Sequence, residues 1–287
     1  MALLEVAGVG KRFGGLQALR DVSMTVNRGE IVGLIGPNGA GKTTLFNCIS
    51  GLLPPTEGCV VFDGVDITAW PVHTRARAGI ARTFQLVQTL SAMTVRDNLA
   101  VAAHTRTAGN VVADVLRLPS GLRAGREANE RARVAAAFIG IEHLLDTIAG
   151  DLPFGMQRQV ELARALCLRP HLLLLDEAAS GMDSKETAEF AEIVMRARDA
   201  FRMSILWIEH DVPLIRDVCD YTYVLDFGEM LAEGTADEVT QDPRVREAYT
   251  GSPIEEPTGQ ADTETALLAQ PKKKARVRSG PKERVRA

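Results

Sequence analysis

The chain has 287 residues, of which 46% are hydrophobic and 24% are charged, and its formal net charge at pH 7 is -4. This composition predicts a globular protein with a substantial core and gives no basic signature of nucleic acid as its main partner. Apolar runs such as 172–175 are too short to cross a bilayer, and the N-terminal residues lack the pattern of an export signal. The four cysteines form no C-x-x-C pair, so neither a zinc site nor a disulfide framework is expected.

The first clear elements surround a glycine-rich loop. Residues 29–35 contain an apolar run bounded by glycine, which predicts a buried strand. The loop follows at once, and residues 43–50 then carry apolar side chains at helical spacing until Gly51. The predicted order is therefore strand, loop and helix.

Further along the chain, strand and helix signals alternate. Residues 172–175 and 204–208 read as buried strands separated by helical stretches, which favours a parallel α/β sheet. Residues 85–152 are alanine-rich and include a helical pattern at 123–140, so we expect an inserted helical subdomain there. Near the end, residues 221–225 and 229–233 flank the tripeptide Asp226-Phe227-Gly228, as in a β-hairpin.

The composition changes after Gly251. Residues 252–270 are polar and acidic, and residues 271–287 hold eight Lys or Arg against one Glu. We therefore expect a folded unit over 1–251 and a disordered tail over 252–287. The basic run is typical of a solvated tail, although attraction to an anionic membrane surface is a functional alternative. A nucleic-acid role for the tail has no support in the folded part.

The strongest chemical signal is a P-loop. It matches G-x-x-x-x-G-K-[ST] as Gly36-Pro37-Asn38-Gly39-Ala40-Gly41-Lys42-Thr43. The glycines let backbone N–H groups curl around phosphate oxygens, and Lys42 supplies a charge for the β and γ phosphates. Thr43 offers a hydroxyl to Mg²⁺, and the helix that follows adds the positive end of its dipole. A tight glycine turn before a helix is the alternative, but a buried strand before the loop favours the phosphate site.

Two carboxylates end the strand at 172–175. Asp176 is expected to hold Mg²⁺, usually through water, and Glu177 to polarise the attacking water as general base. Solvent-facing acids after a buried strand are common, so this assignment depends on the P-loop upstream.

Together these motifs resemble the ATP-binding subunits of ABC transporters. Residues 36–44, ending at Thr44, are similar to the Walker A motif, and residues 172–177 to the Walker B motif. Residues 82–85 resemble the Q-loop, which implies that Gln85 touches Mg²⁺ and the attacking water. Residues 180–183 resemble the D-loop of the dimer interface, and residues 208–211 the switch segment.

The resemblance also assigns single residues that would otherwise mean little. His210 would hydrogen-bond the γ-phosphate, although a lone histidine at a strand end is more often structural. Phe13 lies where the family places an aromatic side chain that stacks on adenine, although an isolated phenylalanine is more often part of a core.

The signature segment departs from the family pattern. Residues 152–158 lie where the family carries LSGGQ, just before a helix expected at 159–168. Gly155 is retained for binding the γ-phosphate held by the opposite subunit, but Pro153 replaces the serine and so removes a hydroxyl and a backbone N–H. A plain helix N-terminus with a preceding proline is the alternative. We expect a weaker composite site. Ala178 replaces the proline that usually follows the Walker B glutamate.

The branch most resembled is that of branched-chain amino acid uptake, with urea and amide importers close by. The shared features are the Phe154 position of the signature, the Gln157-Arg158 pair, residues 81–85, the insert at 110–140 and the ending at 234–251. The resemblance implies an α/β fold with a P-loop (RecA-like) parallel sheet core, an N-terminal antiparallel β part and a helical subdomain inserted at about 86–158.

The same resemblance implies a mechanism and partners. It describes an ATPase that uses ATP and Mg²⁺, pairs with a second ABC ATPase subunit as a homo- or heterodimer, and binds transmembrane permease subunits at the cytoplasmic face of the membrane. A solute-binding protein would be an indirect partner. The main alternative is a regulatory half that binds ATP with little turnover. ABC ATPases of DNA repair need a long coiled coil, and translation factors of this type need two tandem modules; neither feature is present.

Overall fold

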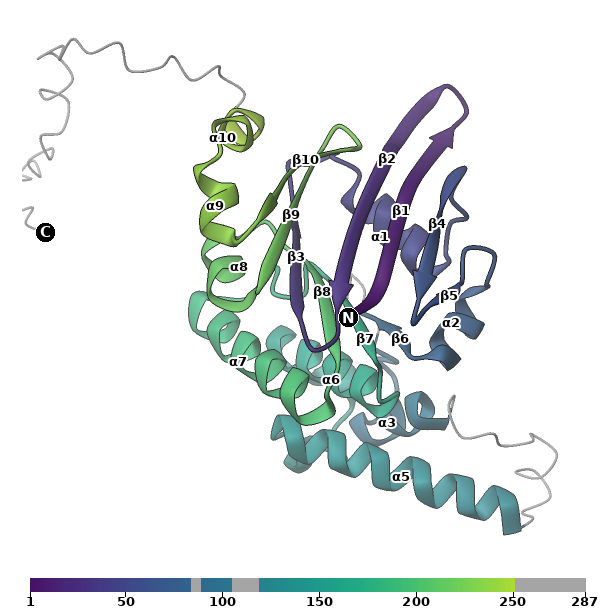
Figure 1. The fold of residues 1–287 in the computed structure, drawn as a ribbon. Coiled ribbons are helices and arrows are strands. Elements are labelled where there is room, and N and C mark those ends of the chain that lie inside the picture. Colours follow the sequence, from purple (N-terminus) through teal and green to yellow (C-terminus); the bar gives the residue numbers. More distant parts are fainter. Residues whose placement is uncertain (84–88, 105–118, 251–287) are drawn as a thin grey trace, which may run out of the picture. The chain divides into compact units, whose positions relative to one another are not determined.

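The computed structural model describes residues 1–83, 89–104 and 119–250. Residues Met1–Ser252 form one compact unit. Its elements (Figure 1) are, in chain order, β1 (Ala2–Phe13), β2 (Leu16–Asn27), β3 (Ile31–Ile35), α1 (Lys42–Ser50), β4 (Glu57–Phe62), β5 (Val65–Asp66), α2 (Val72–Ala78), β6 (Ile80–Arg82), α3 (Val95–His104), α5 (Pro119–Ile139), the short 3₁₀ turns η1 (Glu142–Leu144) and η2 (Ala149–Asp151), α6 (Phe154–Cys167), β7 (Leu172–Asp176), α7 (Ser184–Phe201), β8 (Ser204–Ile208), α8 (Val212–Val218), β9 (Tyr221–Asp226), β10 (Glu229–Gly234), α9 (Ala236–Gln241) and α10 (Pro243–Thr250).

The described strands form two sheets. One has the order β2-β1-β4-β5 with antiparallel neighbours, and the other has the order β10-β9-β3-β8-β7-β6. In the second sheet all neighbours are parallel except β9 and β10, which form the predicted hairpin. The predicted fold class is therefore confirmed, with a parallel core and an N-terminal antiparallel part.

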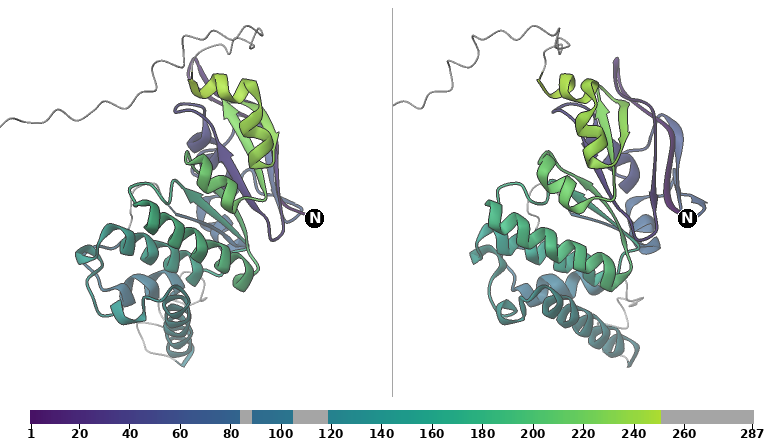
Figure 2. Two further views of the ribbon diagram at one scale, coloured as in Figure 1. Left: turned by 90° about the vertical axis from the view of Figure 1, so that its left-hand side faces the viewer. Right: turned by 60° about the vertical axis from the view of Figure 1, so that its left-hand side comes forward.

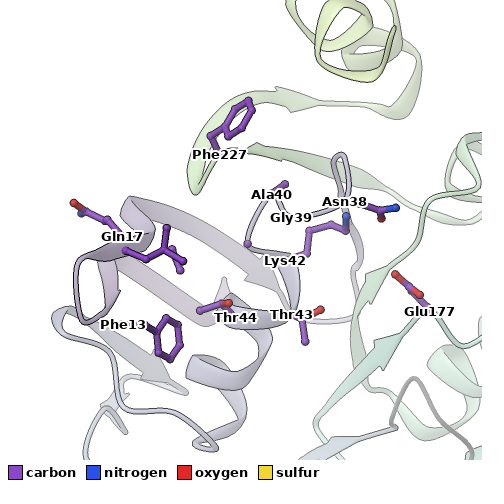
Figure 3. Close-up of a pocket in the computed structure, with 13 residues that line it drawn as sticks. Phe13, Gln17, Asn38, Gly39, Ala40, Lys42, Thr43, Thr44, Glu177 and Phe227 are labelled. Carbon is purple, nitrogen blue, oxygen red and sulfur yellow. The ribbon is translucent and has the colours of Figure 1, made fainter. Parts of the chain in front are cut away.

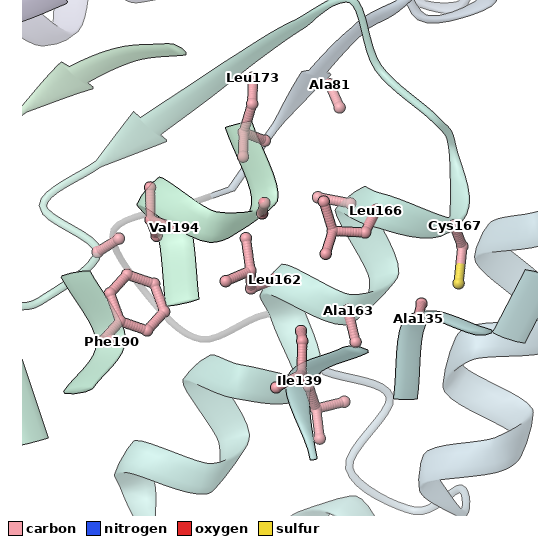
Figure 4. Close-up of a cluster of buried hydrophobic side chains, with 14 of the residues drawn as sticks. Ala81, Ala135, Ile139, Leu162, Ala163, Leu166, Cys167, Leu173, Phe190 and Val194 are labelled. Atoms are coloured by element: carbon pink, nitrogen blue, oxygen red, sulfur yellow. The ribbon is translucent and has the colours of Figure 1, made fainter. Parts of the chain in front are cut away.

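The parallel sheet is covered on both faces, which explains the continuous apolar run of β7. Leu173 and Leu175 join a core with α5, α6 and α7, shown in Figure 4. Leu172 and Leu174 point the other way, into a core with α1 and the antiparallel sheet. Successive residues of a strand face opposite sides, so both sets can be apolar only when helices or a second sheet cover each face.

Helices α3, α5 and α6 pack on one another and supply the alanine-rich part of the first core. In Figure 2 they lie together at one side of the sheets, coloured from blue (α3) to teal (α5 and α6). The helix expected at 123–140 is present as α5, while residues 105–118, which include part of the expected insert, lie outside the described residues. No helix within the described ranges is both long and apolar enough to cross a membrane.

One predicted boundary is wrong. The helix expected to begin at Gln159 begins at Phe154, with Pro153 as its N-cap residue. The helix begins earlier because a proline ahead of a helix loses no intrahelical hydrogen bond, and a glycine is tolerated in the first turn. Gly155 therefore lies inside α6.

Candidate nucleotide-binding site

The glycine-rich loop between β3 and α1 is shaped by close backbone contacts. Gly36 has φ 149° and Gly41 has φ 103°, both in the region that disfavours other residues. A Cβ atom at Gly36 would lie 2.0 Å from the Leu225 carbonyl oxygen, and one at Gly41 would lie 2.8 Å from that of Ala18. These two glycines are required because strands β2 and β9 leave no room for a side chain.

Lys42, the first residue of α1, is held inside this loop. Its side chain is buried, and Nζ donates hydrogen bonds to the carbonyl oxygens of Gly36 at 2.6 Å and Pro37 at 3.0 Å. Burial lowers the pKa of Lys42, while Glu177 and Asp176 oppose that shift. The ammonium group therefore lies within electrostatic reach of both acids, at a helix N-terminus suited to anions.

A cavity of about 510 Å³ opens over the loop (Figure 3). It brings together predicted site residues from three parts of the chain: β1, the loop with α1, and the end of β7. The lining consists of Phe13, Leu16, Gln17, Ala18, Asn38, Gly39, Ala40, Gly41, Lys42, Thr43, Thr44, Glu177 and Phe227. Phe13 is 45% exposed, so its ring is accessible to a ligand instead of belonging to a core.

Asp176 ends β7 and is almost fully buried. Its Oδ2 atom accepts a hydrogen bond of 2.7 Å from Arg82 Nη2, whereas Oδ1 accepts none from any described residue. Burial raises the pKa of Asp176, and the hydrogen bond and charge of Arg82 oppose that rise. A buried acceptor left open in this way requires a partner, which the described side chains do not supply.

These groups fit a magnesium ion. Carboxylate, hydroxyl and phosphate oxygens are the ligands that Mg²⁺ prefers, and it usually takes only one or two of them from protein. Asp176 Oδ1 offers the open acceptor, and Thr43 lines the cavity beside Lys42. No cluster of three or more His, Cys, Asp or Glu occurs among the described residues.

Glu177 adopts a conformation that is rare for its residue type. Its φ is 46°, in the left-handed region, and its backbone N–H donates to the Ile208 carbonyl at 2.9 Å. Such a backbone is retained where surrounding contacts enforce it, and it is frequent at functional sites. The turn aims Glu177 into the cavity, as Figure 3 shows, whereas the preceding aspartate stays buried.

The segment after β8 holds one exposed and one buried side chain. His210 is 61% exposed on its side chain and does not line the cavity, and its Nδ1 lies 3.8 Å from Glu209 Oε2. Glu209 is buried, and its Oε1 accepts hydrogen bonds from Ala179 N at 3.1 Å and Trp207 Nε1 at 3.2 Å. Burial raises the pKa of Glu209. Glu209 thus ties the β8 end to the turn after Glu177.

Besides His210, the predicted residues Gly36, Pro37, Asp176 and Gly155 do not line the cavity. Gln85 lies outside the described residues. Gly155 lies in the first turn of α6, where an added Cβ would approach Glu186 Oε1 at 2.9 Å, and it does not line the cavity. Pro153 caps α6 without any side-chain hydrogen bond.

Sequence reasoning missed several lining or supporting residues. Phe227 lines the cavity from the tip of the β9–β10 hairpin, and Leu16 and Gln17 line it from the start of β2. Gly228 N donates to the Ala40 carbonyl at 2.9 Å, which fixes the hairpin against the loop. The hairpin was predicted, but nothing local in the sequence indicated that it packs on the P-loop. The Arg82 contact with Asp176 likewise joins distant parts of the chain.

Comparison with known proteins gives consistent similarities. Residues 19–180 match the family described as ABC transporter, and residues 229–254 match the branched-chain amino acid ATP-binding cassette transporter family. The chain is 41% identical to the high-affinity branched-chain amino acid transport ATP-binding protein LivG of Escherichia coli (strain K12), over 87% of this chain and 98% of that protein. It is 36% identical to the lipopolysaccharide export system ATP-binding protein LptB of the same strain, over 88% and 98%. The crystal structure of a nucleotide-free ATP-binding cassette from an ABC transporter superposes with TM-score 0.77 at 32% identity, covering 88% of this chain and all of that one.

Proposed function

The chain belongs to the ABC transporter family of ATP-binding cassettes, and from this premise we propose that it powers the uptake of branched-chain amino acids or related small polar solutes. The observation that carries the proposal is a cavity lined by both the Lys42 loop and Glu177. A phosphate cradle and a candidate base on one nucleotide-sized pocket are what ATP hydrolysis requires.

In this proposal the ATP phosphates lie in the loop of residues 36–44. The N–H groups at the start of α1 and the Lys42 ammonium bind the β and γ phosphates, and Phe13 packs on the adenine at the other end of the cavity. Thr43 and Asp176 would hold Mg²⁺, which supplies neutralisation of charge on the phosphate oxygens. The buried Asp176 Oδ1 supports this role.

Hydrolysis then needs a water molecule aligned with the γ-phosphate. Glu177 accepts a proton from that water as it attacks, while Lys42 stabilises the charge that develops on the phosphate oxygens. His210 and Gln85 act beside it, the first as a donor to the γ-phosphate and the second on the water and metal. His210 lies outside the cavity lining, so this role requires it to reach the nucleotide from the cavity edge.

The active form in this proposal is a dimer bound to permease subunits at the cytoplasmic face of the membrane. We assign the start of α6, where Phe154 and Met156 are partly exposed and Gly155 is buried, to a nucleotide held by a second ATPase subunit. Closure on ATP and release after hydrolysis would pass through the helical subdomain to the permease. A solute-binding protein would deliver the solute indirectly.

The solute class follows from the C-terminal match more than from the cassette itself. LivG and LptB, whose printed names differ in transported molecule and direction, are both more than a third identical to this chain. The match of residues 229–254 to the branched-chain amino acid family favours uptake of that class.

A second candidate is a regulatory half that binds ATP with little turnover. Pro153 favours it, because the signature position lacks the serine hydroxyl and the N–H. Glu177 in the cavity opposes it, since a non-catalytic half has no need of a base there.

The test is purification of the tagged chain from membranes with its bound permease subunits, followed by assay of ATP hydrolysis with leucine, isoleucine or valine and the solute-binding protein. We expect turnover that these amino acids stimulate, and its loss together with nucleotide binding in Lys42→Ala. Turnover without any such stimulation would contradict the solute class. Binding of Mg·ATP without turnover would favour the regulatory half, and absence of binding in calorimetry would reject the proposal.

A further inference from the structure

Arg82 connects the buried acid of the site to the helix that follows the P-loop. It ends β6, next to β7, and its side chain is 9% exposed. Nη2 donates to Asp176 Oδ2 at 2.7 Å, and Nη1 donates to Asn47 Oδ1 at 2.6 Å and to Ser50 Oγ at 3.1 Å. The guanidinium also lies over the Phe46 ring, 5.7 Å from its centroid. One side chain therefore binds an acid at one end and two polar groups of α1 at the other.

This contact leaves the two oxygens of Asp176 unequal. Oδ2 is occupied by Arg82, whereas Oδ1 is buried and accepts no hydrogen bond from the described residues. A carboxylate held through one oxygen cannot rotate freely, so the direction of the other oxygen is fixed as well. The planar, forked guanidinium is suited to this task because its donors have a rigid geometry.

The second end of Arg82 sets where that oxygen lies relative to the phosphate cradle. Asn47 and Ser50 belong to α1, the helix that begins with Lys42 and Thr43. Arg82 thereby fixes Asp176 against the same rigid element that presents the Thr43 hydroxyl. The two candidate metal ligands, Asp176 and Thr43, are then fixed relative to each other. This matters because Mg²⁺ demands near-octahedral geometry.

We propose that Arg82 is a positioning residue for Mg²⁺: by holding Asp176 Oδ2 and α1 together, it directs Oδ1 to the metal of Mg·ATP. The inference rests on the proposed ATP site and adds a residue to it. A purely structural ion pair is the competing explanation. Breaking a buried ion pair destabilises a protein whatever its function, so the two explanations are separated by metal binding and not by stability.

The two explanations differ in what they predict for the metal. We would measure the dissociation constant of ATP by calorimetry, once with Mg²⁺ and once with EDTA. The dissociation constant with EDTA divided by that with Mg²⁺ gives the metal's contribution to binding. Arg82→Lys keeps the charge but cannot span Asp176 and Asn47 at once. We expect this ratio to fall about tenfold in Arg82→Lys, because a hydrogen bond to a charged group is lost. The dissociation constant measured with EDTA should stay within about twofold of that of the wild type. Mn²⁺ replaces Mg²⁺ for paramagnetic resonance, in which the Mn·ATP spectrum of the variant should broaden or change.

Two further variants make the test specific. Asn47→Ala removes only a contact of Arg82 with α1 and keeps its hydrogen bond to Asp176, so we expect the ratio to fall about threefold. This variant also tests the proposal if Arg82→Lys does not fold. Arg75→Lys is the matched control, because Arg75 is buried and anchors α1 through the Cys48 and Ile49 carbonyls, both at 2.7 Å, without touching Asp176. It should lower the melting temperature and leave the ratio unchanged.

The inference is overturned if Arg82→Lys keeps the wild-type ratio, or if ATP affinity falls equally with and without the metal. It is also overturned if wild-type ATP binding does not depend on Mg²⁺, in which case the proposed ATP site still stands. If the wild type binds no ATP under either condition, the proposed function itself fails.

Discussion

We propose that two helix N-termini in this chain bind phosphate, and they are built differently. The start of α1 is enclosed: Lys42 is buried and bonded to its own loop, and residues from β1, β7 and the β9–β10 hairpin line the cavity above it. The start of α6 is open, with Phe154 43% and Met156 36% exposed and no side-chain hydrogen bond from Pro153.

The difference separates what one chain does alone from what it does in a pair. Phe13, the Lys42 loop and Glu177 of one chain line the cavity at α1, so we expect nucleotide binding there to be a property of the monomer. At α6, Phe154 and Met156 are partly exposed and Pro153 gives no side-chain cap, so we expect its contribution to appear only in the assembled dimer. Substitutions at the two places should therefore affect different measurements.

The largest effect is expected from Gly36→Ala. The added Cβ would meet the Leu225 carbonyl oxygen at 2.0 Å, and backbone cannot yield as a flexible side chain can. We expect ATP affinity of the isolated chain to fall more than about a hundredfold, measured by calorimetry. Gly39→Ala is the control, since Gly39 also has a positive φ, 84°, but no atom within 4 Å of the added Cβ. It should cost only the left-handed backbone penalty, about 1 to 2 kcal/mol. Equal losses in both variants would contradict the steric argument.

Glu177→Gln should separate binding from turnover at the enclosed site. The amide keeps the shape of the side chain but cannot accept the proton of the attacking water, so turnover of the assembled complex should fall by a factor of about 100 or more. ATP affinity of the isolated chain should stay within about threefold. Size-exclusion chromatography with Mg·ATP should show the variant retained as a dimer. Normal turnover would show that Glu177 is not the base.

The enclosed site was largely predictable from sequence because its signals are local. The pattern of residues 36–43 and the strand ending in Asp176 and Glu177 predicted which residues meet at the cavity, and the strand and helix order predicted the fold, which is confirmed. The start of α6 was misplaced because proline and glycine are ambiguous there: they break a helix in its interior and are tolerated at its N-terminus.

Contacts between distant segments were not predictable. Arg82 and Asp176 are 94 residues apart in the chain, and their pairing follows from the adjacency of β6 and β7. Phe227 reaches the cavity only because β9 lies beside β3 and the hairpin packs on the loop. A single sequence contains no local pattern for either contact, since both depend on strand order in the finished sheet.

Pro153→Ser tests the open helix. Serine restores a hydroxyl and an N–H at the position where a partner's γ-phosphate is expected, so turnover of the assembled complex should rise about threefold to tenfold. Pro153→Ala restores the N–H alone and should give a smaller rise. Because α6 does not line the cavity of its own chain, ATP affinity of the isolated chain should not change in either variant. Unchanged turnover in Pro153→Ser would mean that the substitution at this position does not weaken the composite site.

The smallest effect is expected from Glu209→Gln, which concerns how the enclosed site is supported. Burial raises the pKa of Glu209 in the folded chain, so the folded state binds its proton more tightly than the unfolded state does. The stability that this carboxyl contributes is therefore full below its unfolded pKa, and it is lost as pH rises through the higher folded value. Glutamine keeps an oxygen that can accept from Ala179 N and Trp207 Nε1 but carries no charge. We would measure melting temperatures from pH 4 to pH 8. As pH rises, the melting temperature of the variant should increase relative to that of the wild type by about a few degrees. A constant difference across that range would mean that the Glu209 charge is already compensated, and that its role is hydrogen bonding alone.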